Sequence, residues 1–393
     1  MNSSIFNYCF LIFLLCVPFV PYFGTIDIIG AQWFYLSIGN LFFFLYNFSK
    51  NNYLHIFKSI LTLTHFKLYL LFIFISLFSI FYSINWSVSM VDFSRILIVL
   101  FSIIHVLLVF RDPLFSLRRL SFLISIILLI EIFISFYPVI EFLRVNNFSE
   151  IDFSILPNVL KGVSGNKNVL AADIVFKSAF LFYSIISSKR FTRLFFMLSL
   201  LITSSLIILL SSRASYISFS FVLILFMSYI IFKRQFLKQF LYIILPLFFS
   251  YFIVSSLTSN ETIISDRLST IASPSTDTST NQRLFLYENA IDFISNNPLV
   301  GCGLGNWKLR SLPYWKDKLS GYTIPYHAHN DFLELSAELG LLGGLPYFFI
   351  FILIFFKSFF SFFKTQNNIL YVLIFALTSV YFIDAMLNFP FER

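Results

Sequence analysis

Long apolar runs constrain the fold of this chain more than any other feature. A bilayer core about 30 Å thick is crossed by about 20 apolar helical residues, because each residue rises about 1.5 Å. About eleven such runs follow one another along the 393 residues: 5–23, 26–47, 68–85, 92–110, 119–140, 168–187, 192–210, 214–232, 237–257, 344–363 and 369–389. The first run has no basic segment or small-residue cleavage site, which favours a retained helix over a signal peptide. We therefore predict an all-α, polytopic membrane protein with about eleven transmembrane helices.

The composition excludes several classes of protein. Hydrophobic residues make up 58% of the chain and charged residues 12%, whereas roughly a quarter of a soluble domain is charged. Intrinsic disorder is excluded too, because it requires low hydrophobicity and high net charge. The three cysteines, Cys9, Cys16 and Cys302, are too few for a disulfide framework or a cysteine-rich zinc site. Redox chemistry is not indicated.

Lysine and arginine predict the orientation in the membrane. The formal net charge is +8. One set of alternate loops holds 14 basic residues and a single acid, Asp112: Lys50, Lys58, Lys67, Arg111, Arg118, Arg119, Lys189, Arg190, Arg193, Lys233, Arg234, Lys238, Lys357 and Lys364. Short basic loops remain cytoplasmic, so we expect a cytoplasmic N-terminus and two long extracytoplasmic segments, 141–167 and 258–343. Topology accounts for these charges without nucleic acid as a partner.

The extracytoplasmic segment 258–343 is where chemistry is expected, because loops of this length are usually functional or disordered. Ser269 to Asn281 is rich in Ser, Thr, Asp and Pro and is predicted to be a mobile polar stretch. Arg283 to Ser295 is predicted to be an amphipathic helix, ended by Pro298. Its expected apolar face consists of Leu284, Tyr287, Ile291 and Ile294. We expect one large, partly helical loop that folds as a unit.

Two histidines precede a second predicted helix in this loop. Asp331 is expected to cap that helix with Glu334 three residues on, and Gly340 is expected to end it. His327 and His329 stand just before its start. A metal site would need a further ligand that is not obvious in the sequence. The alternatives are a hydrogen-bonded pair at a helix start, and an imidazole that acts as a general base or stabilises charge near neutral pH.

Two arginines differ in position from the others. Arg213 is the only charge in a very short outer turn, and Arg283 begins the amphipathic helix. Each is either an anchor at the lipid headgroups or a bidentate clamp on a phosphate, which the guanidinium geometry suits. The glycines Gly301, Gly303 and Gly305 favour a tight turn over a phosphate loop, because no Lys-Ser/Thr pair follows them.

Four segments in the second half of the chain carry these residues in order. They are Gly165-Asn-Lys-Asn168-Val-Leu, Ser212-Arg213-Ala-Ser, Asn281-Gln-Arg283 with Asn297-Pro298-Leu-Val-Gly301-Cys-Gly303-Leu-Gly305-Asn-Trp307, and His329-Asn330-Asp-Phe-Leu333-Glu-Leu-Ser-Ala-Glu338-Leu-Gly340-Leu-Leu-Gly343. Their order and content resemble the O-antigen ligase and O-antigen polymerase superfamily of membrane glycosyltransferases. The resemblance covers about residues 160 to 390, and the last two segments are its specific part.

The resemblance implies an activity and a set of site residues. Such enzymes transfer a glycan from an undecaprenyl-diphosphate carrier to a sugar acceptor, such as lipid A core or a growing glycan, at the bacterial cytoplasmic (inner) membrane. They need no metal or cofactor. The implied catalytic residues are His329, Arg283 and Arg213, and the implied substrate-binding residues are Asn330, Glu338, Gly301, Gly303, His327 and Asn168. Residues 1–157 would form N-terminal transmembrane helices, and residues 158–393 the catalytic region. Ligase, polymerase and protein-glycan transferase types differ only in the acceptor and stay open.

Four ionisable residues within predicted spans suggest an alternative function. They are Glu131, Asp173, Lys177 and Asp384. Such residues are functional candidates by default. Asp173 and Lys177 are four residues apart and can neutralise each other, while Glu131 and Asp384 would line a polar cavity or pair with the lysine. The alternative is a transporter or flippase of lipid-linked glycan, which predicts two related halves. The sequence shows no such repeat.

Overall fold

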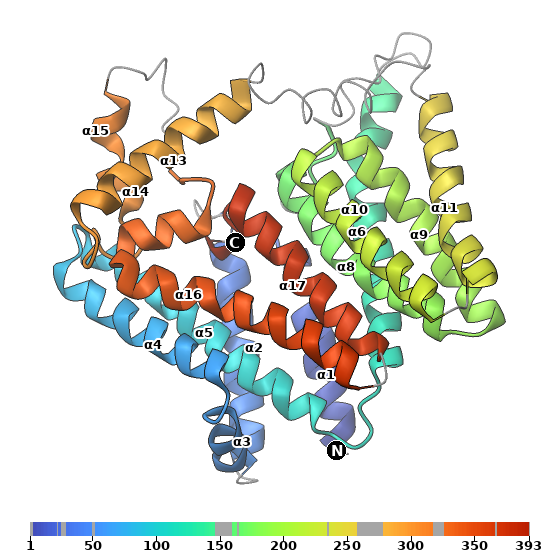
Figure 1. Ribbon diagram of the computed structural model, residues 1–393, viewed down its shortest axis with the longest axis horizontal. Helices are drawn as coiled ribbons and strands as arrows, with labels where there is room; N and C mark the ends of the chain where they lie inside the picture. Colours follow the sequence, from blue (N-terminus) through green and yellow to red (C-terminus); the bar gives the residue numbers. More distant parts are fainter. Residues whose placement is uncertain are drawn as a thin grey trace. The chain divides into compact units, whose positions relative to one another are not determined.

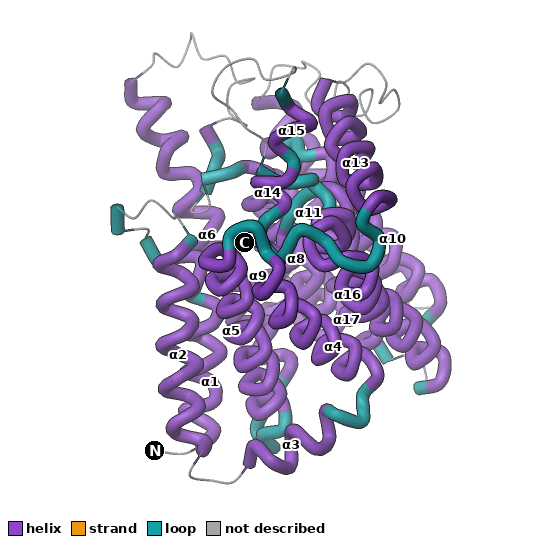
Figure 2. Tube along the Cα trace, turned by 90° about the vertical axis from the view of Figure 1, so that its left-hand side faces the viewer, coloured by secondary structure: helices purple, strands orange, loops and turns teal. Residues whose placement is uncertain are grey.

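The computed structural model describes residues 3–21, 23–24, 29–48, 52–145, 159–162, 165–233, 236–257, 278–316, 326–365 and 368–392. Within these ranges the chain consists of helices and connecting loops without a strand (Figures 1 and 2). The predicted all-α fold is therefore confirmed. The predicted mobile stretch lies outside the described residues up to residue 277, and its last four residues are helical.

The helices follow one another in this order: α1 (Ser3–Leu15), α2 (Gly30–Phe48), α3 (Asn52–Ile60), α4 (Thr64–Ser79), α5 (Trp86–Phe110), α6 (Leu117–Val145), α8 (Lys167–Ser187), α9 (Arg190–Leu210), α10 (Arg213–Phe232), α11 (Phe236–Leu257), α13 (Thr278–Asn296), α14 (Trp307–Arg310), α15 (Leu312–Trp315), α16 (Asp331–Lys364) and α17 (Ile369–Leu387). Short 3-10 helices occur at Val17–Phe19, Ile80–Tyr82 and Pro390–Glu392.

Nine helices of the described part are long and apolar enough to cross a membrane: Thr64–Tyr82, Trp86–Phe110, Leu117–Glu141, Lys167–Ser187, Arg190–Leu210, Arg213–Phe232, Lys238–Ser256, Asp331–Lys364 and Ile369–Leu387. They correspond to the last nine predicted runs. The first two runs are also helical, but they are not among the nine. The helix α1 has only 13 residues, and α2 contains the polar residues Gln32, Asn40 and Asn47.

The chain divides into two compact units whose segments alternate in sequence. The first unit contains Met1–Phe115, Asp277–Ile354 and Ala385–Arg393, and the second contains Ser116–Thr276 and Phe355–Asp384. The predicted catalytic region, residues 158–393, contributes to both units. That functional division stays a prediction.

In the second unit, α8 is the most buried of the nine spans and carries a charged cluster. The ammonium of Lys177 lies 2.5 Å from Glu131 Oε2 on α6 and also contacts the carboxylate of Asp173. The predicted Asp173–Lys177 pair is therefore confirmed, and Glu131 joins it. Because apolar surroundings penalise an isolated charge strongly, mutual neutralisation explains how these groups are accommodated inside a span.

Candidate functional site

The helix α13 begins the described part of segment 258–343, the loop predicted to be extracytoplasmic, in the first unit. It covers the predicted range Arg283 to Ser295, and Pro298 follows its end as expected. The predicted apolar face is wrong in part, because Leu284 and Ile291 are about half exposed. The buried face consists instead of Leu286, Asn289, Ala290 and Phe293. This face is the buried one because the small Ala290 lets the helix lie close to a core that also contains Cys302, Trp307, Ala328 and Ala337.

The helix α16 is interrupted at Gly340, as the sequence predicts. Gly340 has φ 68° and ψ 177° and separates a first half, residues 331–339, from the apolar second half. A Cβ atom at Gly340 would lie 2.1 Å from the carbonyl oxygen of Leu299. The break also frees the Leu341 N–H, which donates to the Pro298 carbonyl at 2.8 Å. Only glycine permits this close passage of two backbones.

We call residues 298–305 the Gly-rich loop, and it completes the broken end of α16. The last carbonyls of a helix lack partners within it. Here Cys302 N–H donates to the Ala337 carbonyl at 3.1 Å, and Gly303 N–H donates to the Glu338 carbonyl at 2.8 Å. Burial raises the pKa of the Cys302 thiol, with Glu338 adding to the effect. The loop is therefore a buried structural element held by main-chain bonds.

The glycines of this loop permit its close packing. Gly303 and Gly305 have φ values of 95° and 70°. An added Cβ would lie 2.3 Å from Ser83 at Gly303, and 2.0 Å from Asp92 Oδ2 at Gly305. At Gly301 it would lie 2.2 Å from the Ala337 carbonyl oxygen. The predicted tight turn is confirmed, while the predicted substrate-binding role of Gly301 and Gly303 stays a prediction.

Two polar side chains join the Gly-rich loop to its neighbours. Asn306 is fully buried; its amide oxygen accepts from Asn85 N–H at 2.7 Å, and its amide nitrogen donates to Ser89 Oγ at 2.8 Å. Both partners lie where α5 begins. Glu338 is 2% exposed, and its Oε1 accepts from Trp307 N–H at 3.0 Å. Glu338 was predicted to bind substrate, and the structure gives it a definite bond within the protein.

We call residues 326–330 the His loop, which leads into the first half of α16. The predicted capping residue is off by one position. Asn330 Oδ1, rather than Asp331, accepts from the N–H groups of Phe332 and Leu333, at 3.0 and 3.1 Å. Asp331 Oδ2 instead accepts from Phe391 N–H at 2.9 Å. Asn and Asp are equally good caps, so their adjacency in the sequence left the choice open.

Glu334 fixes the first part of the His loop. Its Oε2 accepts from Ala328 N–H at 2.8 Å, and its Oε1 lies 2.9 Å from His327 Nδ1. Glu334 is 5% exposed and Ala328 is fully buried. The sequence assigned Glu334 to helix capping only, so this contact was missed. Within the described residues, no group of three or more His, Cys, Asp and Glu is placed to hold a metal ion.

His329 is held in an uncommon backbone conformation. Its φ of 55° lies in the left-handed region, which disfavours an L-residue by about 1–2 kcal/mol. Its carbonyl oxygen is 3.0 Å from the hydroxyl of Tyr287 on α13. Burial raises the pKa of that phenol, while the nearby Arg283 opposes the shift. Tyr287 therefore stays protonated near neutral pH and can donate.

Residues 386–391 form a C-terminal segment that contacts both histidines. The ring of Phe389 stacks on His327, with centroids 4.1 Å apart, and meets His329 edge-on at 5.0 Å. Asn388 is 3% exposed, and its Oδ1 lies 3.5 Å from Nη2 of Arg283. Arg283 and His329, predicted as partners, are thus brought into one neighbourhood by Tyr287 and this segment.

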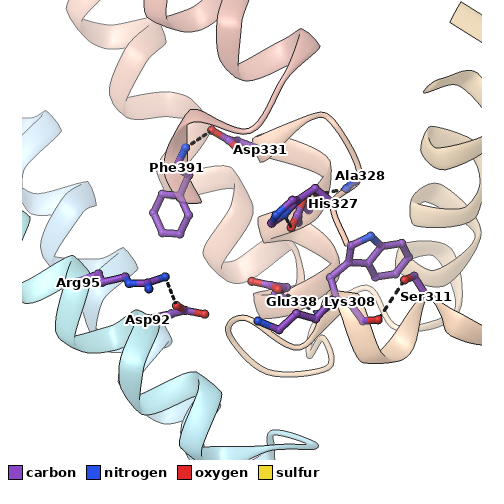
Figure 3. A network of polar contacts seen from close by, with 11 residues as sticks. Asp92, Arg95, Lys308, Ser311, His327, Ala328, Asp331, Glu338 and Phe391 are labelled. Carbon is purple, nitrogen blue, oxygen red and sulfur yellow. Dashed lines mark hydrogen bonds and ion pairs between the residues drawn. The ribbon is translucent and has the colours of Figure 1, made fainter. Parts of the chain in front are cut away.

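A charged pair on α5 also faces this region. Arg95 Nη1 is 3.1 Å from Asp92 Oδ1, and Asp92 is 5% exposed. In Figure 3 both side chains extend from α5 toward Glu338, and Lys308 extends toward it from the other side. The sequence reasoning missed this pair because the apolar run was taken to begin at Asp92. The signal that could have found it is an acid and a base three residues apart at the edge of a span.

The two remaining predicted residues, Arg213 and Asn168, belong to the second unit. Arg213 is the first residue of α10, after a sharp turn in which Ser211 has φ 46°. The predicted short turn between two spans is therefore present. Asn168 lies in the first turn of α8, and its N–H donates to Asn166 Oδ1 at 2.9 Å. Both residues lie in the first turn of a helix, where backbone N–H groups and the helix dipole favour the binding of anions.

Residues 198–348 match the family model of the O-antigen ligase. A comparison with curated proteins gives no match. The matched stretch contains Arg213, Arg283 and His329, together with α13, the Gly-rich loop and the first half of α16. Together with the nine apolar spans of the described part, it indicates a multi-pass bacterial membrane protein of the ligase or polymerase type of glycan assembly. This match agrees with the resemblance to the O-antigen ligase and polymerase superfamily found in the sequence.

Proposed function

We propose that this protein transfers a glycan from an undecaprenyl-diphosphate carrier to a sugar hydroxyl on the extracytoplasmic side of the bacterial inner membrane. The observation that carries the proposal is the common neighbourhood of Arg283 and His329. Tyr287 lies one helical turn after Arg283 on α13 and reaches the His329 carbonyl. The family match over residues 198–348 supports the same type of reaction.

In the proposed reaction the acceptor hydroxyl oxygen attacks the anomeric carbon of the donor sugar. A bond forms between these two atoms, and the bond from the anomeric carbon to the diphosphate oxygen breaks. The diphosphate leaves with the electron pair, and the hydroxyl proton passes to the imidazole of His329. Imidazole suits this role because it takes up a proton near neutral pH. No metal takes part.

Positive charge is needed where the diphosphate leaves, because negative charge develops there in the transition state. Arg283 supplies it in the first unit, and its guanidinium can hold two phosphate oxygens at once. We propose Arg213 as a second donor-binding residue from its sequence motif. Asn330, Glu338, Gly301, Gly303, His327 and Asn168 are proposed to shape or bind the substrates.

The test is replacement of His329 or Arg283 by Ala in the source cell. We expect loss of surface glycan at unchanged protein level in the membrane, because each variant removes a group that acts in the transition state. The readouts are the banding of the surface polysaccharide and the amount of the protein in isolated membranes. Isolated membranes supplied with lipid-linked glycan give the transfer rate directly.

Two matched variants serve as controls. Lys316→Ala removes an exposed basic residue from the same loop, and His55→Ala removes an exposed histidine on α3. Both are expected to leave the glycan unchanged. Unaltered glycan in His329→Ala or Arg283→Ala would refute the site assignment.

The acceptor separates the ligase from the polymerase type. Loss of long chains alone in a deletion strain indicates a polymerase, because single repeat units are still attached. Loss of all attached glycan indicates a ligase. The same preparation tests the transporter alternative, since Lys177→Ala with intact transfer in membranes but no surface glycan would favour it. We do not expect that result, because Lys177 is engaged by two carboxylates in a structural cluster.

A further inference from the structure

The C-terminal segment, residues 386–391, contacts four separate parts of the first unit. Asn388 lies beside Arg283 of α13, and Phe389 lies between the rings of His327 and His329. Phe391 N–H donates to Asp331 at the start of α16. The ring of Phe391 packs edge-on against Phe72 of α4 and Tyr347 of α16. A short segment thus connects the His loop to three helices.

Tyr287 connects the same segment to the backbone of His329. Its hydroxyl oxygen is 3.0 Å from the His329 carbonyl oxygen and 2.9 Å from the Met386 carbonyl oxygen. A phenol has one proton, so it donates to one of these carbonyls at a time or shares the proton between them. In either case the hydroxyl holds the His loop and the C-terminal segment at a fixed separation.

His329 depends on such contacts more than an ordinary loop residue does. A residue other than glycine with positive φ keeps that conformation only when its surroundings determine it. The bond from Ala328 N–H to Glu334 fixes the chain just before His329, and the Asn330 cap fixes it just after. The His329 ring contacts Phe389, and its carbonyl oxygen contacts the Tyr287 hydroxyl.

We propose that Tyr287 and the C-terminal segment, through Phe389, are positioning residues that set the orientation of the His329 imidazole. This role rests on the proposed function of His329 in glycan transfer. Tyr287 acts through the backbone of His329, and the Phe389 ring restricts rotation of both imidazoles. Neither residue needs to contact a substrate. The predicted result of removing either one is a mobile imidazole in a folded protein.

Three variants of the full-length chain in proteoliposomes test the proposal. Tyr287→Phe removes only the hydroxyl, Phe389→Leu removes the ring, and Phe389→Tyr keeps a ring of the same shape. Tyr314→Phe is the matched control, because its hydroxyl donates to Asp292 at 2.9 Å rather than to the backbone of His329. The first readout is the rate at which diethyl pyrocarbonate modifies His329, followed by tandem mass spectrometry.

We expect faster modification of His329 in Tyr287→Phe and Phe389→Leu, and the rate of the unaltered protein in Phe389→Tyr and Tyr314→Phe. The second readout is transfer of lipid-linked glycan. In the two affected variants kcat is expected to fall about tenfold or more, while KM for the donor changes less than about twofold. Rescue of both readouts by Phe389→Tyr separates ring packing from a general loss of fold.

The outcomes test the positioning role of Tyr287 and Phe389 separately from the proposed glycan transfer. Equal modification rates in all variants would overturn the positioning role, whatever the activity. Faster modification with unchanged kcat would also overturn it, because orientation would then be irrelevant to the reaction. If the modification rates differ as expected but the unaltered protein transfers no glycan, the positioning is supported and the proposed function fails.

Discussion

The Gly-rich loop and the His loop flank opposite ends of the first half of α16, and different kinds of bond hold them. Main-chain N–H groups of Cys302 and Gly303 bond to the last carbonyls of this half-helix. The His loop is held by hydrogen bonds of side chains, above all those of Asn330 and Glu334. A main-chain bond survives most substitutions, whereas a side-chain bond is lost with its residue. The first arrangement therefore suits a fixed support, and the second suits a site whose geometry can be adjusted residue by residue.

The largest effect is expected from Gly340→Ala. An L-residue at φ 68° is disfavoured, and its Cβ would lie 2.1 Å from the Leu299 carbonyl oxygen. The free energy of unfolding should fall by at least about 2 kcal/mol, measured by thermal unfolding in detergent. Gly165→Ala is the matched control, because Gly165 has the same φ and no atom within 4 Å of an added Cβ. If the free energy of unfolding fell equally in the two variants, the close approach of Gly340 to Leu299 would have no effect on stability.

Glu334→Gln is expected to affect the His loop next most strongly. An amide has one acceptor oxygen, so it can accept from Ala328 N–H or from a protonated His327 Nδ1 but not from both. Leaving a buried donor without an acceptor costs about 1–3 kcal/mol, and glycan transfer should fall because the His loop is displaced. Unfolding temperature and transfer rate are the measurements. Glu288→Gln, an exposed change on α13, should alter neither the unfolding temperature nor the transfer rate. If Glu334→Gln also left both unchanged, side-chain bonds would not be what holds the His loop.

Asn330 provides a smaller and more selective test. Asn330→Ala removes the N-cap of α16 and should lower stability by about 1 kcal/mol, while Asn330→Asp should keep the cap and the stability. Transfer by Asn330→Asp then distinguishes two roles. Retained transfer means that capping is the whole contribution, and lost transfer at full stability means that the amide also binds substrate. The measurements are unfolding in detergent and the transfer rate in membranes.

The smallest effect concerns the thiol of Cys302 in the Gly-rich loop. Burial raises its pKa, so the reactive thiolate is scarce at pH 7 and increases only as the pH rises toward that pKa. We expect almost no alkylation by a membrane-permeant maleimide at pH 7, read by mass spectrometry. Val300→Cys places a thiol at an exposed position of the same loop and should react fully. Rapid alkylation of Cys302 would show that the loop opens.

The sequence predicts the features of this fold that have a local cause. A run of about 20 apolar residues predicts each of the nine spans, and an isolated glycine after a short helix predicts the break at Gly340. The existence of α13 follows from its periodicity. Its buried face does not follow from the periodicity, because the helix has two apolar faces, one through Leu284 and one through Leu286. Contact with the rest of the core decides which of them is buried.

Contacts between distant residues have no such local signal. The bonds of Asn306 to Asn85 and of Phe391 to Asp331 join residues 221 and 60 positions apart. The candidate residues Arg283 and His329 could be named from their motifs, but the segment that lies between them had to be seen in three dimensions.

The placement of Phe389 has a consequence for biosynthesis. The histidines, α13 and the Gly-rich loop are all translated before α17, while residues 388–391 follow that helix. The His loop therefore lacks its aromatic partner until α17 has been made and inserted. A nascent chain that already contains every predicted catalytic residue would still lack the ring contact of Phe389 with His329. The positioning proposed for that imidazole would therefore be complete only once synthesis has passed Phe391.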